Sequence, residues 1–255
     1  MLKRTEGIVI RTVPYGEADL IVTYLTSDFG ILKVFAKSPR KFRSRFGGSL
    51  EPLTHARIAF YGRQDASLPR LTQSDILNSF HQLREEFSSY IRLSEILELI
   101  IAFLPERDAN IMAYSLLLNT LRTVAEKQND TLLMTSFKIK FLHLVGFAPR
   151  LDSCGRCGRR GYTFYLAQGS IMCEGCARAI DSPFRISPAA VKCYADLLTW
   201  DIMMIHRIRP SPSLLAELST LLAMHIRYIL SKPLKTESFF NIHPHQKNQF
   251  SPDDP

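Results

Sequence analysis

Two closely spaced cysteine pairs constrain this chain more than any other feature of its sequence. Cys154 and Cys157 enclose two residues, as do Cys173 and Cys176, and fifteen residues separate the two pairs. This spacing is typical of zinc ribbons, because thiolates two residues apart on a tight turn can face one cation. Two disulfides are the alternative. Because the N-terminus lacks the charged and then apolar segment of a secreted protein, and Cys193 remains single, we favour one zinc ion.

The expected ligand set consists only of thiolates. A four-thiolate site is closed, which leaves no position for water or substrate, so the zinc ion is predicted to be structural rather than catalytic. Gly155, Gly158 and Gly175 permit the turns that bring the two pairs together. Cys193 is predicted to be a small buried apolar residue in a helix.

The N-terminal residues 1–78 have the pattern of short strands. Five segments rich in β-branched and aromatic residues are separated by turn residues: 7–10, 20–25, 31–35, 56–61 and 71–77. Five strands in so short a stretch suit a small closed barrel, and we predict an OB-fold domain over residues 1–78. An SH3-like barrel fits the same periodicity, because strand order cannot be derived from one sequence.

From residue 79 the apolar period becomes helical, which predicts a helical domain over residues 79–240. The expected helices span residues 89–104, 109–125, 132–145, 188–200 and 213–229. The cysteine segment, at residues 151–179, interrupts them as an embedded zinc ribbon. Residues 241–255, which contain Pro244, Pro252 and the two aspartates Asp253 and Asp254, are expected to be disordered. The predicted fold class is therefore α+β and multidomain.

The charge balance favours a polyanionic partner. Lys and Arg number 32 against 24 for Asp and Glu, a formal net charge of +8, and such an excess is common in proteins that bind nucleic acid. The longest apolar run, residues 96–104, is far shorter than the roughly 20 residues of a membrane-spanning helix, so no membrane span is expected. Reduced, metal-bound thiols and the absence of an export signal predict a cytoplasmic, nucleoid-associated protein.

Residues 33–45 contain six cations and no acidic residue, with Phe35, Phe42 and Phe46 interleaved among them. A loop of this kind supplies cations for phosphates beside rings on which exposed bases can stack. The predicted DNA-contacting residues are Lys33, Lys37, Arg40, Lys41, Phe42, Arg43 and Arg45. The alternative is a solvated loop with Phe42 tucked under the barrel.

A second basic group surrounds the cysteine pairs. It consists of Arg150, Arg156, Arg159, Arg160 and Arg178. These arginines either contact DNA or only keep a metal module soluble.

Sequence motifs of common catalytic centres are absent. The chain has no Gly-x-x-x-x-Gly-Lys-Ser/Thr loop, no Gly-x-Ser-x-Gly elbow and no His-Glu-x-x-His pair. We therefore expect a protein that is not an enzyme.

Several motifs resemble, in order and spacing, the bacterial RecO family of DNA repair proteins. Those of the N-terminal region are Thr5-Glu-Gly-Ile-Val-Ile10, Tyr15-Gly-Glu-Ala-Asp19, Leu25-Thr-Ser-Asp-Phe-Gly30, Val34-Phe-Ala-Lys37 and Gly47-Gly-Ser-Leu-Glu-Pro-Leu53. The likeness continues through the apolar helices, Gly146-Phe-Ala-Pro149 before the cysteines, and Leu234-Lys-Thr236. One departure is Ser38, where the family usually has glycine.

The resemblance implies an N-terminal OB-fold, a helical domain with an embedded zinc finger, and a recombination mediator of the RecF pathway. Proteins similar to this one bind single- and double-stranded DNA and anneal complementary strands. They work with RecR and the C-terminal tail of the single-strand-binding protein to load RecA. The alternative from the residues alone is a zinc-ribbon module that contacts transcription or translation machinery and binds nucleic acid weakly.

Overall fold

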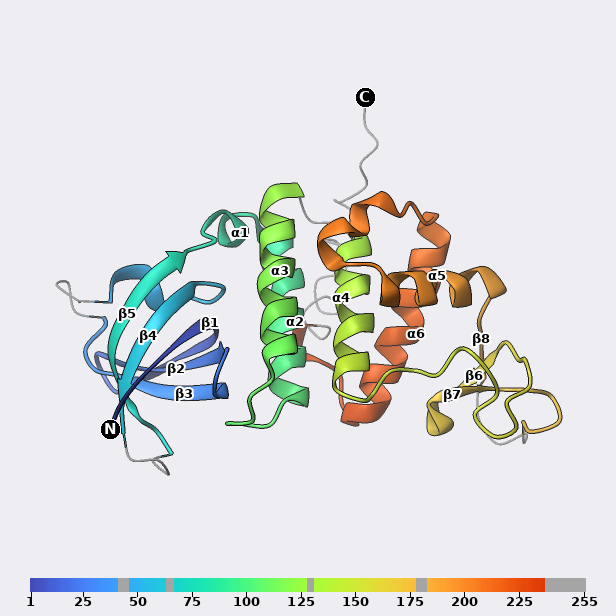
Figure 1. The fold of residues 1–255 in the computed structure, drawn as a ribbon, viewed down its shortest axis with the longest axis horizontal. Coiled ribbons are helices and arrows are strands. Elements are labelled where there is room, and N and C mark those ends of the chain that lie inside the picture. The colour runs from blue at the N-terminus through green and yellow to red at the C-terminus, as the bar shows by residue number, and fades with distance from the viewer. Residues whose placement is uncertain (41–45, 63–66, 128–130, 178–182, 237–255) are drawn as a thin grey trace. The chain divides into compact units, whose positions relative to one another are not determined.

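Five strands near the N-terminus close into a barrel in the order β1-β2-β3-β5-β4 (Figure 1). Their bounds in this computed structural model are β1 Leu2–Tyr15, β2 Asp19–Thr26, β3 Gly30–Ala36, β4 His55–Tyr61 and β5 Arg70–Asn78. Neighbouring strands are antiparallel, except that β3 and β5 run parallel where Phe35 meets Arg70. The predicted OB-like barrel is confirmed, and this strand order decides against the SH3-like alternative.

The structure describes residues 1–40, 46–62, 67–127, 131–177 and 183–236. The tail predicted for residues 241–255 lies outside them. The chain forms two compact units, one of Met1–Leu93 with Ile100–Asn129 and one of Ser94–Leu99 with the chain from Asp130 onward. Helix α2, Phe87–Phe103, contributes residues to both units.

Strand β1 closes the barrel because it pairs along its length with two partners. Its first part pairs with β4 and its second part with β2, and the register to β2 shifts between Val9 and Arg11. A β-bulge of this kind bends a strand and increases its twist. The sequence predicted only residues 7–10 of this strand, because the flanking residues are mostly polar and are held by backbone hydrogen bonds.

Both faces of β1 are buried at its centre. Val9 belongs to the barrel core, whereas Ile8 and Ile10, which alternate with it, face the opposite side. Helix α3, Ile111–Lys127, packs against β1 and β2. The helix thus covers this side of the barrel and explains why the run of apolar residues in β1 is continuous rather than alternating.

A buried polar contact joins α3 to the barrel. The His55 Nε2 atom lies 2.8 Å from the hydroxyl oxygen of Tyr114. Burial lowers the pKa of His55 and raises the pKa of Tyr114 to about 12, so both groups are neutral near pH 7. A neutral pair satisfies its hydrogen-bonding groups at this contact without burying a charge.

The second unit contains three long helices and a small sheet. The helices are α4 Thr131–Leu144, α5 Pro188–Thr199 and α6 Pro212–Leu230, and these three pack against one another. Helix α5 begins as predicted: Pro188 occupies its first turn, and the Ser187 hydroxyl accepts a hydrogen bond from the Ala190 N–H at 3.1 Å. Ser187 also donates to the Glu217 carboxylate at 2.8 Å, which ties this start to α6.

The five predicted helices lie within two residues of the observed bounds. The sequence did not predict the short helices η1 Gly47–Leu50, α1 Gln82–Glu85 and η3 Ile202–Arg207, or the elements of the cysteine segment. The latter are β6 Thr163–Tyr165, η2 Leu166–Gln168, β7 Ser170–Met172 and β8 Phe184–Arg185, with sheet order β7-β6-β8. Elements this short carry too few residues for a periodic pattern.

Helix α6 is long and apolar enough, by length and composition alone, to cross a membrane. Its buried residues include Leu218, Leu221 and Leu222, and it packs against α4 and α5. The His225 Nε2 atom on the same helix lies 2.9 Å from the carbonyl oxygen of Phe147. These contacts attach one face of the helix to the second unit.

Two glycines with left-handed backbones give a matched pair of variants. Gly30 has φ +60 and a Cβ there would lie 1.9 Å from the Asp108 carbonyl oxygen, whereas Gly16 has φ +62 and open space. Both Gly→Ala variants should carry the left-handed penalty of about 1–2 kcal/mol. We expect only Gly30→Ala to lower the free energy of unfolding by more than about 4 kcal/mol, because the backbone of Asp108 must move. Thermal unfolding checks this, and equal losses would contradict the close approach.

Candidate nucleic-acid interface and cysteine cluster

The outer side of β3 carries one cation and one aromatic ring between buried residues. Lys33 is exposed and Phe35 half-buried, whereas Leu32, Val34 and Ala36 point into the barrel core. The Lys33 ammonium forms an ion pair with the carboxylate of Glu106, which is distant in sequence. Its charge is therefore partly neutralised before any ligand binds.

The start of the predicted DNA-contacting loop is fixed to the β1–β2 turn. The Arg40 N–H donates to the Ala18 carbonyl at 3.3 Å, and the Ser38 N–H donates to Asp19 Oδ1 at 2.6 Å. Ser38 has φ +57, the left-handed conformation that glycine adopts most easily, at the position where the RecO family usually has glycine. Lys37 and Arg40 are exposed beside this turn.

The other predicted contacts of this loop lie outside the described residues. They are Lys41, Phe42, Arg43 and Arg45, and they stay predictions.

The expectation that Phe46 lies beside the loop cations for stacking is wrong. This side chain is only 3% exposed and belongs to the barrel core, together with Leu50 and Phe60. A phenylalanine that follows a cation in sequence can serve either the surface or the core, and the small barrel needs the ring to fill its interior.

Two residues that the sequence analysis missed lie next to Phe35. The ring of Tyr15, at the end of β1, packs edge-on against Phe35, with centroids 5.9 Å apart and planes at 88°. Arg70, the first residue of β5, is exposed and is the Cα partner of Phe35. Tyr15 is 55% exposed, so an aromatic surface lies open among Lys37, Arg40 and Arg70. The β-strand pairing reveals this grouping, which the sequence could not.

The four predicted metal ligands lie together in the second unit. The sulfur atoms of Cys154, Cys157, Cys173 and Cys176 are all within 4.8 Å of one another, and those of Cys157 and Cys173 are 3.5 Å apart. A tetrahedral ion about 2.3 Å from each sulfur requires sulfur atoms about 3.8 Å apart. The described residues contain one group of three or more potential metal ligands, and it is this one.

Local hydrogen bonds prepare the cluster for a cation. Backbone N–H groups, first that of Cys173 and then those of Cys157 and Arg156, lower the pKa of Cys154 to about 6. The neighbouring sulfurs, first Cys157 and then Cys173, raise the pKa of Cys176 to about 12. Four thiols held this close cannot all ionise unless a cation offsets their mutual repulsion.

Glycines bring the two cysteine turns against the small sheet. A Cβ at Gly155 would lie 2.3 Å from Ser170 Oγ, and one at Gly161 would lie 2.6 Å from the Met172 carbonyl oxygen. The Cys154 N–H donates to the Arg159 carbonyl at 2.8 Å and closes the first turn. The chain is therefore folded tightly around the sulfur atoms by close backbone approach.

The predicted arginine group near the cysteines does not form one uniform surface. Arg150 pairs with Asp152, with Nε and Oδ1 3.3 Å apart, whereas Arg156, Arg159 and Arg160 are exposed. Arg178 lies outside the described residues. Charge near the ribbon is thus carried mainly by the residues just before β6.

Comparison with known proteins identifies related sequences along nearly all of the chain. The family model "Recombination protein O N terminal" matches residues 1–80, and "Recombination protein O C terminal" matches residues 84–238. The chain is 37% identical over 232 residues to the DNA repair protein RecO of Thermodesulfovibrio yellowstonii, which covers 89% of this chain and 92% of that protein. It is 32% identical over 247 residues to RecO of Symbiobacterium thermophilum, covering 94% and 97% of the two chains.

Proposed function

Because the chain belongs to the RecO family of DNA repair and recombination mediators, we propose that it binds single- and double-stranded DNA and anneals complementary strands. The observation that carries this proposal is the aromatic pair of exposed Tyr15 and half-buried Phe35 on the barrel. The exposed cations near this pair are Lys37, Arg40 and Arg70. Rings of this kind stack bases whatever their identity, and the cations pair with phosphates.

Annealing follows from these two contact types. Cations on the protein reduce the repulsion between two phosphate backbones. Phosphate contacts and stacking carry little sequence information, so the Watson–Crick edges stay free to find their complement. Annealing needs no covalent bond to be made or broken in the DNA, and we infer that the protein acts without a catalytic centre.

We infer that the four-cysteine cluster holds one structural zinc ion. The sulfur separations suit a tetrahedral ion, and an all-thiolate set is preferred by zinc in closed sites. When bound, the ion would neutralise the thiolates and crosslink the two turns that flank β6 and β7.

The partners we propose are RecR, the single-strand-binding protein and, through them, RecA. The acidic, aromatic-ended tail of the single-strand-binding protein requires an apolar surface with cations. The second unit offers exposed Trp200, Met203 and Met204, followed by Arg207 and Arg209. We place the protein in the cytoplasm with the nucleoid, where all of these partners act.

The direct test is a fluorescence annealing assay with complementary oligonucleotides. We expect the protein to accelerate annealing without nucleotide or added metal, and to bind both single strands and duplex. A protein that neither binds DNA nor accelerates annealing would instead fit the zinc-ribbon module that contacts transcription or translation machinery.

Ion pairing predicts how individual barrel cations affect binding. Replacing Lys37 and Arg40 with alanine should flatten the slope of log affinity against log salt by about 1.4, at about 0.7 per single-strand phosphate contact. Lys33→Ala should change the slope less, because Glu106 already neutralises this cation. Tyr15→Leu should cost about 1–3 kcal/mol of single-strand affinity and leave the slope unchanged. An unaltered slope in the variant that lacks both Lys37 and Arg40 would show that DNA binds elsewhere on the protein.

Removal of one thiolate should lower the stability of the fold, and any loss of DNA binding should follow from that. We expect Cys157→Ser to lose zinc and to become less stable and less soluble, because zinc binding and folding of the ribbon are coupled. Cys193→Ala is the control, since Cys193 is buried in α5 outside the cluster. Elemental analysis and thermal unfolding measure both effects. Wild-type protein purified without chelator but free of zinc would contradict the proposal.

A further inference from the structure

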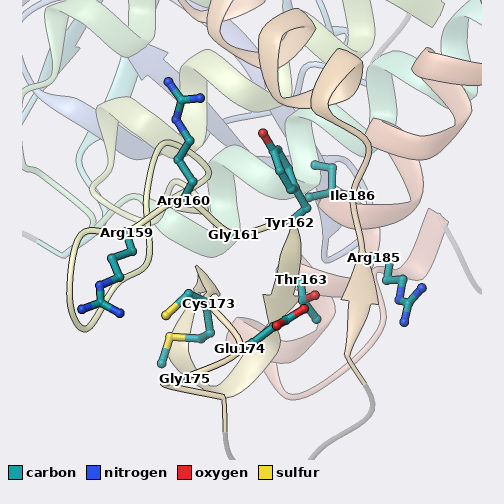
Figure 2. Close-up of a pocket in the computed structure, with 11 residues that line it drawn as sticks. Arg159, Arg160, Gly161, Tyr162, Thr163, Cys173, Glu174, Gly175, Arg185 and Ile186 are labelled. Atoms are coloured by element: carbon teal, nitrogen blue, oxygen red, sulfur yellow. The ribbon is translucent and has the colours of Figure 1, made fainter.

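An open pocket of about 650 Å³ lies on the surface of the cysteine segment (Figure 2). We call it the ribbon pocket; residues 159–163, 172–175 and 185–186 line it. We propose that the ribbon pocket is a second binding site for single-stranded DNA, with a base against Tyr162 and successive phosphates on Arg159, Arg160 and Arg185. The inference rests on the proposed DNA-binding function and assigns it a second surface.

Arginines outnumber carboxylates among the side chains that line the ribbon pocket. Three of its lining side chains are arginines, and Glu174 is its one carboxylate. All three arginines are exposed, and among the residues that the structure describes none of them forms an ion pair. Arg150 differs, because Asp152 neutralises it. The arginines of the pocket therefore keep their charge for an external anion.

The arrangement of the arginines fits a polymer better than a small anion. Figure 2 shows Arg159 and Arg160 on one side of the pocket and Arg185 on the other, with the side chains fanning outward. Thr163 on β6 and Arg185 on β8 are Cα partners, so the sheet fixes the backbone of Arg185 beside β6. Guanidinium groups on two sides of a pocket suit a strand that crosses it and places successive phosphates on them.

Tyr162 supplies an aromatic surface between these cations. Its side chain is 45% exposed, and Figure 2 shows its ring between Arg160 and Arg185. The Ile186 N–H donates to the Tyr162 carbonyl at 2.9 Å, which fixes the backbone of the tyrosine against β8. An exposed ring flanked by cations is the combination that binds single strands without sequence preference. An acidic peptide would use the arginines but would leave the ring without a stacking partner.

The first test uses two triple variants of the full-length protein. Arg159→Ala, Arg160→Ala and Arg185→Ala remove the charges of the pocket. Lys192→Ala, Arg227→Ala and Lys232→Ala remove the same charge from exposed positions of the second unit outside it. With labelled oligo(dT), we expect the pocket variant to flatten the salt slope by about 2, from three contacts at about 0.7 each, and the matched variant to leave it unchanged. Replacing the three arginines with lysine should restore the slope.

A second measurement concerns the ring and the class of ligand. Tyr162→Ala should weaken oligo(dT) binding by about 5- to 150-fold with the salt slope unchanged. Thymidine monophosphate should fail to compete at phosphate concentrations at which unlabelled oligo(dT) competes. Equal competition by the mononucleotide, or by a glutamate-rich peptide, would overturn the proposal in favour of a small-anion or peptide site.

The outcomes separate this inference from the proposed function. The proposal for the ribbon pocket alone is overturned by one combination of results. The pocket variant keeps its zinc and the wild-type salt slope, while the variant of Lys37 and Arg40 loses affinity. A wild-type protein that binds no DNA overturns both.

Discussion

The two-sided burial of β1 determines which part of the barrel is free to act. Val9 faces the barrel interior, and Ile8 and Ile10 face the side that α3 covers. Burying these side chains stabilises the first unit by about 1.5–3 kcal/mol each. This side of the barrel is therefore not available to a ligand. The β1–β2 turn and the outer side of β3 remain for a ligand. Tyr15, Phe35 and Arg70 lie there because barrel closure brings the ends of three strands together.

The second unit depends on a different interaction. Its helices pack through apolar faces, but the cysteine segment has a sheet of only eight residues in three strands. So small a module buries little apolar surface, and small domains generally need a metal or disulfides for this reason. The four sulfur atoms lie together beside the sheet, where an ion that they held would supply that crosslink. The same lack of a core leaves side chains of the segment at the surface, where its arginines and Tyr162 can contact a ligand.

The sequence predicted what depends on local pattern and missed what depends on distant contacts. The start of α5 was predicted because Ser187 and Pro188 form a cap and first turn that act over four residues. The cysteine cluster was predicted because metal geometry fixes the ligand spacing. The role of Phe46 was predicted wrongly, because its neighbours in sequence are cations whereas its neighbours in space are Leu50 and Phe60. The pair of Lys33 with Glu106 joins positions 73 residues apart, and no local pattern reveals it.

Electrostatics explains why a mediator of this kind benefits from dispersed rather than concentrated charge. The net charge of +8 attracts any DNA strand, but a single deep cationic site would hold one strand tightly and oppose its release after pairing. Here Lys33 of the barrel is already partly neutralised by Glu106, and the exposed arginines of the ribbon pocket lie on the other unit. In the proposed mechanism each surface alone would provide a few phosphate contacts, so each would be weak and sensitive to salt. Two weak surfaces on one chain would raise the local concentration of two strands, and each strand could still leave as a duplex once its bases have paired.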